Sequence, residues 1–554
     1  MTASATPSRT PVKAFAPRLA IRSLLLTALA FTAACGPSET RVETGNREGI
    51  LHINNGTEIQ SLDPHTTSGL PESHVIGALL EGLTAVDPET LEAIPAAARD
   101  WEVSDDGRTY TFYLREDGRW SNGDRVTAHD FVFSFRRILS PNLAAPYHYM
   151  LFPIAGARDF HEGRIEDFSE VGVRARDDQT LEIRLNNPLP YFLTLLAHNA
   201  WYPVHPGTIL THGDLDEPNT RWVRPENFVG NGPFTLERWA AGRRIEVRRN
   251  PDYWDAGRVH LQEIHFYPLE QAQAGERAFR AGQLHITDPV PAERISYYQN
   301  ERSELFNSGD YFGTYYLRLN VTKPPFDDPR VRLALSLALD RETLVNNIYA
   351  GVRPPAYSFV PPGVPGYDPE PVVDRDVERA RELLAEAGYP GGEGFPSTRI
   401  LYNTSDEHSA IAQLVQEMWR RELGVNVGLE NTEWQVYLDR MNRLDYDIAR
   451  SGWIGDYLDP FNFLNTMAGG GGNNRTGWAN EDYDNLLEEI QRTADPEVRR
   501  QRIREAETLL VKEAPVLPLF FYTRMYLKHP AVQNWRPTPT AYRHYKDVRL
   551  SADD

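Results

Sequence analysis

The chain has 554 residues, with 58 lysine and arginine residues against 78 aspartate and glutamate residues and a formal net charge of −20. Because the charges are dispersed and mainly acidic, nucleic acid and anionic membrane surfaces are disfavoured as partners. The length predicts about two to four domains, each able to bury a core of its own.

The N-terminal segment, residues 1–34, has the pattern of a secretory signal peptide. Four basic residues and no acidic residue precede an apolar run from Leu24 to Ala34. This run is shorter than the roughly 20 apolar residues that a membrane-spanning helix requires. A membrane anchor helix or a disordered basic tail is the competing interpretation. Removal of the four basic residues would change the net charge from −20 to −24.

Cys35 is the only cysteine of the chain and directly follows Ala34. Its position resembles the first mature residue of a bacterial lipoprotein, whose sulfur receives a diacylglycerol, although Thr32 stands where leucine is usual. Simple cleavage after Ala34, which would leave a free thiol, is the alternative. A single cysteine excludes an intrachain disulfide. We expect a lipid on Cys35 and a flexible polar tether over residues 35–48.

The body of the chain alternates short strands with helices. The first strand is expected from Leu51. Two-residue alternation predicts strands at residues 108–116, 180–186, 234–239 and 243–250, the last two forming a hairpin. Helical periodicity with acidic caps and closing glycines predicts helices at 328–349, 376–389, 408–424 and 495–514, and a strand at 516–522. This order predicts a mixed α/β fold but does not identify a function.

The sequence contains no catalytic or metal-binding motif that we can identify. It lacks HExxH, GxSxG, a Walker A loop and a GxGxxG after a strand. The only thiol lies at the processing site, and the histidine spacings do not suit a tetrahedral metal site. The four glycines at 469–472 lack a following Lys-Ser/Thr and are interpreted as a flexible loop. We therefore expect no enzyme activity, no metal and no cofactor.

A family resemblance is carried by the segment EWQVYLDRMNRLDYDIARSGWIGDYLDPFNFLNTM, residues 433–467. It is similar to the ligand-contact segment of the oligopeptide-binding proteins of bacterial ABC importers, which are extracellular solute-binding proteins of family 5. Further matches follow in the family's order and spacing at residues 54–65, 120–137, 231–239, 250–254, 323–341 and 401–408. The resemblance thus runs from about residue 50 to near the C-terminus.

The resemblance implies an α/β periplasmic-binding-protein fold of type II, in the large three-domain class. Lobe I would be discontinuous, formed by residues 49–80, 206–312 and 524–554. An extra domain would span 81–205 and lobe II 313–523. The crossings near Phe312 and Thr523 would form the hinge, so that the lobes close on a ligand and the closed form docks on the permease.

A receptor for peptides of varied sequence must hold the charged α-amino group, pair with the backbone and leave room for side chains. The resemblance implies that Asp456 binds the α-amino group and that Arg450 and His408 bind carboxylates. It implies backbone pairing at Leu70, Gly452, Trp453 and Ile454, where Gly452 would allow close approach. The side-chain pockets would be lined by Ser68, Tyr147, His198, Tyr311, Tyr316, Trp434 and Tyr522.

Four departures separate the chain from the well-known enterobacterial members. Ser68 stands where they carry glutamate, Tyr349 where they carry lysine, and Met441 and Asn442 where they carry an Arg-His pair. Their disulfide positions are here Gly313 and Ile454, in agreement with the lone cysteine. We expect the grip on the amino end to be retained and the pocket selectivity to differ.

Competing interpretations exist for each site residue. Asp456 resembles a turn or N-cap residue before Asp459, and Arg450 has Asp445 and Asp447 nearby in sequence as ion-pair partners. His408 would simply begin a helix, and any single aromatic residue would pack in the core.

We expect a monomeric receptor, anchored in the periplasm of a Gram-negative host, that binds peptides of roughly two to five residues and passes them to an ABC importer. Murein-derived peptides as ligands, or a sensing or chaperone role on the same fold, form the second hypothesis. A secreted hydrolase is the third, and it lacks a recognisable nucleophile or metal set.

Overall fold

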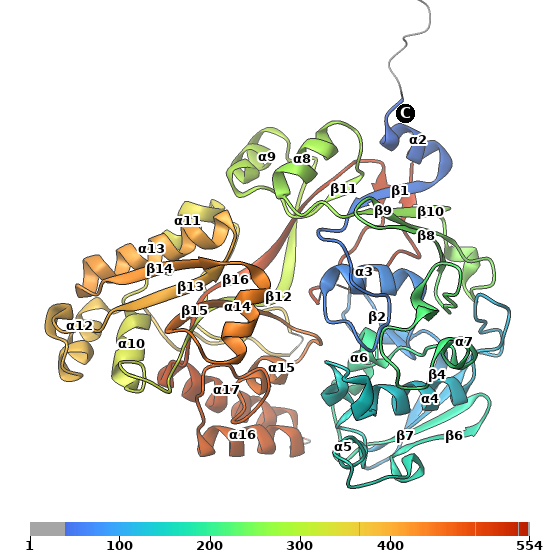
Figure 1. Cartoon of the computed structure of the whole chain (residues 1–554), viewed down its shortest axis with the longest axis horizontal. Coiled ribbons are helices and arrows are strands. Elements are labelled where there is room, and N and C mark those ends of the chain that lie inside the picture. The colour runs from blue at the N-terminus through green and yellow to red at the C-terminus, as the bar shows by residue number, and fades with distance from the viewer. Residues whose placement is uncertain (1–38, 365, 494, 541, 552–554) are drawn as a thin grey trace, which may run out of the picture.

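The structure, a computed structural model, describes residues 39–364, 366–493, 495–540 and 542–551. The predicted signal peptide and Cys35 lie outside these residues. A ten-stranded sheet runs through the molecule (Figure 1). Its strand order is β14 (Val427–Thr432), β13 (Thr398–Asn403), β15 (Ile448–Ile454), β12 (Phe306–Leu319), β16 (Val516–Lys528), β11 (Ile286–Thr287), β1 (Ile50–Asn54), β10 (Glu263–Tyr267), β9 (Arg244–Arg249) and β8 (Phe234–Ala240).

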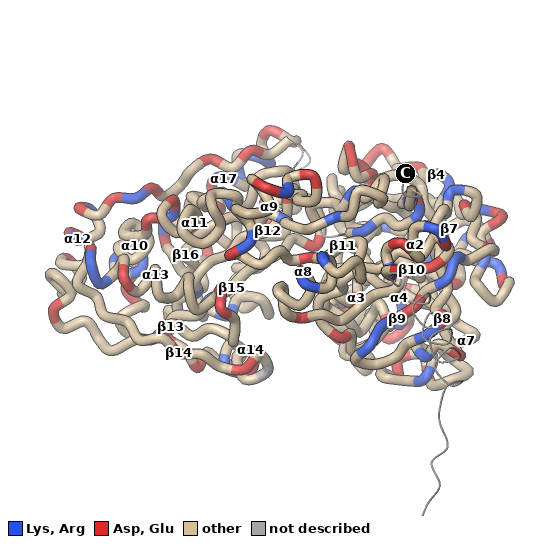
Figure 2. The backbone as a smooth tube through the Cα atoms, turned by 90° about the horizontal axis from the view of Figure 1, so that it is seen from above, with Lys and Arg blue, Asp and Glu red and all other residues tan. Residues whose placement is uncertain are grey.

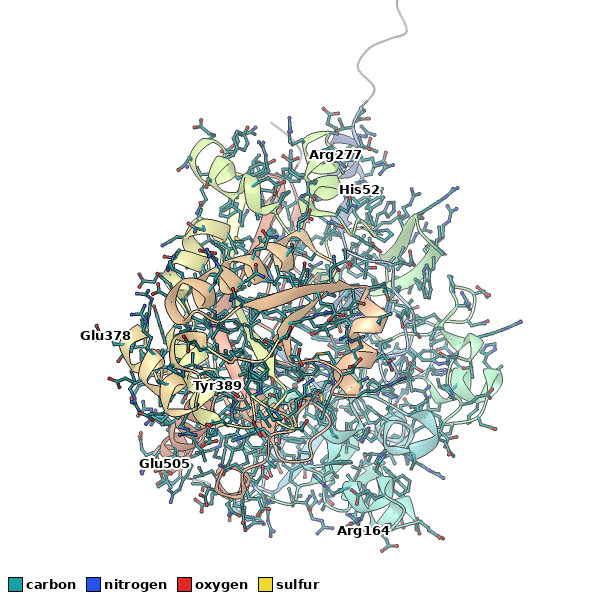
Figure 3. The ribbon with its side chains drawn as sticks, turned by 60° about the vertical axis from the view of Figure 1, so that its left-hand side comes forward. His52, Arg164, Arg277, Glu378, Tyr389 and Glu505 are labelled. Atoms are coloured by element: carbon teal, nitrogen blue, oxygen red, sulfur yellow. The ribbon has the colours of Figure 1, made fainter. Side chains whose placement is uncertain are left out.

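Strands β11, β1, β10, β9 and β8 form the sheet of lobe I. The predicted hairpin of β8 and β9 is confirmed, and β1 pairs in parallel with β10. Helices α8 (Ala272–Arg280) and α9 (Ile295–Glu301) lie at the end of this lobe that is uppermost in Figure 1. Figure 3 shows His52 and Arg277 at this end of the molecule and Arg164, in the extra domain, at the opposite end.

The expectation of a flexible tether up to residue 48 is wrong. Residues Arg41–Glu48 form helix α2, which opens with a reciprocal capping box between Thr40 and Glu43. Val42 is buried and its N–H donates to the carbonyl of Gly282, so the helix packs on lobe I. The Thr-x-x-Glu spacing was a readable signal for this helix start, and the folded body begins about ten residues earlier than predicted.

The extra domain contains a four-stranded sheet of its own. Its order is β4 (Ala98–Val103), β5 (Thr109–Leu114), β7 (Thr180–Arg184) and β6 (Val173–Asp177), which confirms the predicted strands at 108–116 and 180–186. Helix α4 (Ala128–Leu139) covers this sheet and buries Phe131 and Phe135 against it. The domain occupies the lower right of Figure 1.

Lobe II surrounds β13, β14 and β15 with helices. Its helices include α12 (Val377–Glu386), α13 (Asp406–Leu423), α14 (Trp434–Asn442), α15 (Phe461–Leu464), α16 (Glu481–Arg492) and α17 (Pro496–Glu513). The single helix predicted at 328–349 is instead two, α10 (Pro329–Leu337) and α11 (Arg341–Tyr349). The break occurs because the side chain of Asp340 accepts from the N–H of Thr343 and caps α11.

Two long strands, β12 and β16, cross between the lobes (Figure 1). Their antiparallel register is broken between Asp310, which faces Thr523, and Thr314, which faces Phe521. Within this bulge the N–H of Phe312 donates to the carbonyl of Pro539, and the carbonyl of Phe312 accepts from Gly455. The crossings predicted near Phe312 and Thr523 therefore coincide with a β-bulge, where a strand pair bends most easily.

Acidic and basic residues are interspersed along the whole tube in Figure 2, as expected for a dispersed, solubilising charge. Within the described ranges, we find no helix that is both long and apolar enough to traverse a bilayer.

Candidate functional site

One edge of strand β15 is paired with another strand only at its start. One edge pairs with β12 from Ile448 to Ile454, whereas the ladder to β13 covers only Ile448 and Ala449. From Arg450 onward no described strand pairs with the second edge, although the carbonyl of Arg450 accepts from the Tyr437 hydroxyl. The backbone groups on such an edge can accept an added strand.

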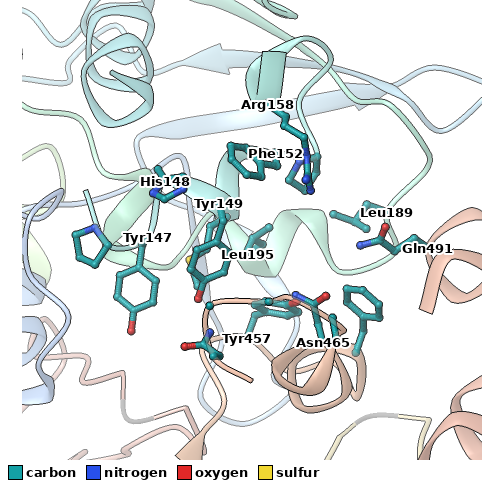
Figure 4. A pocket seen from close by; sticks show the side chains of 18 of the residues that line it. Tyr147, His148, Tyr149, Phe152, Arg158, Leu189, Leu195, Tyr457, Asn465 and Gln491 are labelled. Atoms are coloured by element: carbon teal, nitrogen blue, oxygen red, sulfur yellow. The ribbon is translucent and has the colours of Figure 1, made fainter. Parts of the chain in front are cut away.

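The two faces of β15 point toward two different cavities, because successive side chains of a strand alternate. Trp453 lines the first cavity, of about 960 Å³. Arg450 lines the second cavity, of about 1680 Å³. The first cavity lies between the extra domain and the segment from Tyr457 to Gln491 of lobe II (Figure 4). A chain laid along the free edge would therefore direct alternate side chains into the two cavities.

Asp456 follows β15 and is almost buried, with a side chain that is 10% exposed. Its carboxylate accepts from the Tyr147 hydroxyl at 3.3 Å and lies 3.5 Å from Nδ2 of Asn462. Burial raises the pKa of Asp456 to about 7. Nε2 of His198 lies 4.0 Å away, but burial lowers the pKa of His198 to about 4, so this ring is neutral at pH 7.

The turn or N-cap role that competes with ligand binding at Asp456 is filled instead by Asp459. Asp459 accepts from the backbone N–H of Phe461 and pairs with Arg499 at 2.8 Å. Asp456 accepts no backbone hydrogen bond and pairs with no lysine or arginine among the described residues. It is a buried carboxylate without a counter-charge, and such a group costs free energy unless a cation joins it.

Arg450 is a guanidinium without a carboxylate partner in the described ranges. Its Nε donates to Oδ1 of Asn403 at 2.7 Å, and its charge lies 5.4 Å from the ring centre of Tyr437. The competing ion pairs do not form, because Asp445 pairs with Arg440 and Asp447 pairs with Lys323. Arg450 is therefore available for an anion in the second cavity.

His408 also lines the second cavity, near the start of α13. Its Nδ1 lies 3.2 Å from the Tyr315 hydroxyl, within hydrogen-bond distance. Burial and the charge of Arg450 lower the pKa of His408 to about 3, so it is neutral at pH 7. A neutral imidazole can still donate one hydrogen bond to a carboxylate. The helix-start role also holds, because Ser405 caps the N–H of His408.

Comparison with known proteins places this geometry in a family. The model of the bacterial extracellular solute-binding proteins, family 5, matches residues 92–475. The chain belongs to this family. The periplasmic oligopeptide-binding protein OppA of Salmonella typhimurium is 37% identical over 521 residues, which cover 92% of this chain and 94% of that protein.

Solved structures of family 5 proteins share the fold. Haemophilus influenzae OppA in complex with RPPGFSPFR superposes with a TM-score of 0.80 at 35% identity, covering 91% of this chain and 99% of that one. The Escherichia coli murein tripeptide binding protein MppA gives a TM-score of 0.82 at 32% identity, covering 90% and 98%. The predicted family and the two-lobed α/β fold are thereby confirmed.

The residues expected to line the side-chain pockets divide between the two cavities, and some line neither. Ser68, Tyr147 and Trp453 line the first cavity, and Leu70, Tyr311 and Tyr522 line the second. His198 lines neither cavity but packs on Tyr147, with ring centres 4.8 Å apart. Trp434 also lines neither cavity; its side chain is 45% exposed and stacks on the ring of Tyr437.

The expectation that Tyr316 lines a pocket is wrong for this structure. Its ring is completely buried and packs edge-on against Phe359. Its hydroxyl accepts from Arg318 at 2.9 Å. The neighbouring Tyr315, on the opposite face of β12, is the tyrosine that reaches His408 and packs 6.2 Å from the ring of Tyr522.

Gly452 allows a close approach, but by a side chain of the protein itself. A Cβ atom at this position would lie 2.5 Å from the hydroxyl oxygen of Tyr522. Ile454 pairs with Gly313 in the β12–β15 ladder, so the two positions that the family resemblance singled out face each other.

Sequence reasoning missed three arginines that the fold brings to this site: Arg318, Arg353 and Arg475. Arg353 lines the second cavity and pairs with Glu407 at 3.0 Å, and the Tyr349 hydroxyl donates to the same carboxylate at 2.6 Å. Arg353 thus supplies the positive charge that Glu407 requires. No local motif signals these arginines, because they come from separate elements.

Proposed function

We propose that this family 5 protein captures short peptides between its lobes and delivers them to an ABC importer, without catalysing a reaction. One observation carries the proposal: the free edge of β15 lies between Asp456, a buried carboxylate without a counter-charge, and Arg450, a guanidinium without a carboxylate. A free peptide presents the complementary charges, an ammonium at one end and a carboxylate at the other.

The dimensions fit a short peptide. Asp456 and Arg450 are six residues apart, which corresponds to roughly 20 Å along an extended chain at about 3.3 Å per residue. An extended pentapeptide covers roughly 16 Å of this interval, and the side chains of Arg450 and Asp456 reach across part of the rest. Ligands at the long end of the expected two to five residues would therefore contact both groups. The ammonium would lie at Asp456, the backbone would pair with residues 452–454, and a carboxylate would reach Arg450 and His408.

The charged ends explain how one site accepts varied sequences. Binding free energy comes from the ends and the backbone, which all peptides share. The two cavities, of about 960 and 1680 Å³, leave room for side chains of different size and for water. The names of the relatives, oligopeptide-binding and murein tripeptide binding proteins, support this substrate class.

Mass spectrometry of ligands that co-purify from the native host is the direct test. We expect a mixture of peptides with free amino ends. A homogeneous set of peptides that contain γ-linked glutamate would instead favour the second function, capture of murein-derived peptides, which the 0.82 TM-score with MppA supports. Recovery of shortened peptides after long incubation with the protein would contradict a receptor without catalysis.

We further propose that the protein works as a monomer held at a periplasmic membrane surface through a lipid on Cys35. The proposal rests on the sequence pattern before residue 39 and on the periplasmic names of the relatives. Cys35→Ser should move the protein from the membrane to the soluble fraction of cells. An unchanged distribution would contradict the lipid anchor and leave peptide capture unaffected.

A further inference from the structure

The first cavity has an unusual charge for a protein of this composition. Among the residues that line it, Arg158 and Arg475 are cationic and none is aspartate or glutamate. Acidic residues make up 78 of the 554 in the chain, so their absence from this lining is a local feature and not a property of the surface as a whole.

Arg475 is a cation that the protein leaves unsatisfied. Its guanidinium donates no hydrogen bond to any described residue, and its Nε is buried without a partner. No described carboxylate lies within ion-pair distance of it. A guanidinium presents five N–H donors, and leaving them unpaired in a partly buried site costs free energy.

Arg318 adds a second positive charge behind the cavity wall. Its side chain is almost fully buried and donates to Ser451 Oγ, the carbonyl of Asn473 and the hydroxyl of Tyr316, at 2.9–3.0 Å. All three partners are neutral, so the charge of Arg318 is not compensated. Burial and the charge of Arg318 lower the pKa of Arg475.

Arg158 lies on the opposite wall, in the extra domain. Its guanidinium stacks 4.7 Å from the ring centre of Phe152, and Figure 4 shows the two side chains together beside the cavity. No described carboxylate pairs with it. The glycines at 469–472, which the sequence alone indicated only as a loop, line the same cavity.

We propose that the first cavity binds a carboxylate-bearing side chain of the captured peptide, with Arg475 as its main partner and Arg158 opposite. The proposal rests on the peptide-binding function proposed above and adds the ligand class. A carboxylate would satisfy the free donors of Arg475 and compensate the two adjacent charges. Ser68, which also lines the cavity, is neutral and does not repel an anion.

The alternation of β15 restricts where the acidic residue can be. Neighbouring residues of an extended peptide point to opposite faces, so only positions of one parity can reach the first cavity. We therefore expect a preference for glutamate at one position, or at two positions separated by one residue, and never at adjacent positions.

The test is calorimetric titration of the purified protein with tetra-alanine and with eight variants that carry Glu or Gln at each position. At one position Glu should bind at least about tenfold more tightly than Gln, the effect of one charge-assisted hydrogen bond. Arg475→Met should abolish that preference and change tetra-alanine binding less than about twofold. Arg475→Lys should retain part of it.

Controls separate the possible failures. Arg443→Met, an arginine that is 73% exposed and paired with Asp439, should leave the preference intact. If Arg475→Met does not fold, the more exposed Arg158→Met should still weaken the preference measurably. Equal binding of Glu and Gln at all positions, with tetra-alanine bound, overturns this inference alone. A preference for Glu over Gln that persists in both Arg475→Met and Arg158→Met also overturns it.

A failure of tetra-alanine and of all eight variants to bind would instead overturn the proposed function. One more pair of peptides shows whether the cavity binds the side-chain carboxylate of an ordinary glutamate or the α-carboxylate of a γ-linked one. Glutamate linked through its γ-carboxyl, which leaves the α-carboxylate free, is compared with the corresponding γ-linked amide. Preference for the γ-linked acid over the α-linked Glu peptides would assign the cavity to branched peptides, and the reverse to ordinary acidic side chains.

Discussion

Tyr147 of the extra domain donates a 3.3 Å hydrogen bond to Asp456 of lobe II. The same two domains meet again where Tyr191 stacks on Tyr457, with ring centres 4.6 Å apart. The carboxylate proposed to hold the peptide ammonium is thus desolvated by a contact between domains. We therefore expect a separation of these two domains to expose Asp456, which would couple binding of an ammonium group to the contact between them.

The first prediction concerns the charge of Asp456. Asp456→Asn should weaken binding of a tripeptide with a free amino end by about 2 kcal/mol or more, at least roughly 30-fold in Kd, because a buried ammonium would lose its counter-charge. The N-acetyl form of the tripeptide should bind weakly to both proteins. Calorimetric titration of the four combinations measures the coupling between Asp456 and the amino group.

A matched control is Asp482→Asn, at an exposed position in the first turn of α16. This variant should bind the free tripeptide as tightly as the native protein does. Equal affinity of native protein for the free and the acetylated tripeptide would remove Asp456 from the role assigned to it.

The second prediction follows from the pKa of Asp456, which burial raises from 3.8 to about 7. Between these values the folded protein binds a proton that the unfolded chain does not, so the contribution of Asp456 to stability falls as pH rises from 3.8 to 7. Asp456→Asn should therefore match native stability near pH 4 and exceed it near pH 8. Urea unfolding at the two pH values gives the difference.

Ligand binding has the opposite pH dependence. A peptide ammonium requires the ionised carboxylate, so affinity should fall by up to about tenfold for each pH unit below 7. The affinity of Asp456→Asn should be flat over this range. Burial also raises the pKa of Glu507 to about 7, but this group is common to both proteins and cancels in the comparison. A native affinity independent of pH between 5 and 7 would contradict the assignment.

The third prediction assigns the carboxyl end to Arg450. Arg450→Met should weaken binding of a tetrapeptide with a free carboxylate by roughly 10- to 100-fold, the effect of lost hydrogen bonds to a charged group. The C-terminal amide of the same peptide should bind both proteins with similar affinity. Titrations at several peptide lengths would show which length places its carboxylate at Arg450. Loss of affinity for acid and amide alike would indicate a structural role.

Much of the fold and part of the site were predictable because their signals are local. The β8–β9 hairpin follows from two-residue alternation, and α17 follows from its Asp495-Pro496 start. Asp456, Arg450 and His408 were selected by the family resemblance and not by a local pattern, and we propose their binding roles.

The remaining features depend on contacts that sequence patterns do not encode. Arg318 and Arg475 are 157 positions apart and meet only because β12 and the segment after α15 pack together. The burial of Tyr316 depends on which face of β12 meets Phe359. By contrast, two missed features had local capping signals that hydrophobic periodicity does not detect. Asp340 before Arg-Glu-Thr marks the break between α10 and α11, and Thr-x-x-Glu marks the start of α2.

The fourth prediction tests whether α2 belongs to the folded body. A Cβ atom at Gly45 would lie 2.4 Å from the carbonyl oxygen of Ile50 and 2.7 Å from the ring of His285. Gly45→Ala should therefore destabilise the protein by about 1–3 kcal/mol, because the backbone of β1 cannot move aside cheaply. Gly257→Ala is the matched control, since a Cβ there meets nothing within 4 Å. Urea unfolding compares the two variants. If residues 41–48 were a free tether, both substitutions would leave the free energy of unfolding unchanged, whereas packing of α2 against β1 requires a loss for Gly45→Ala alone.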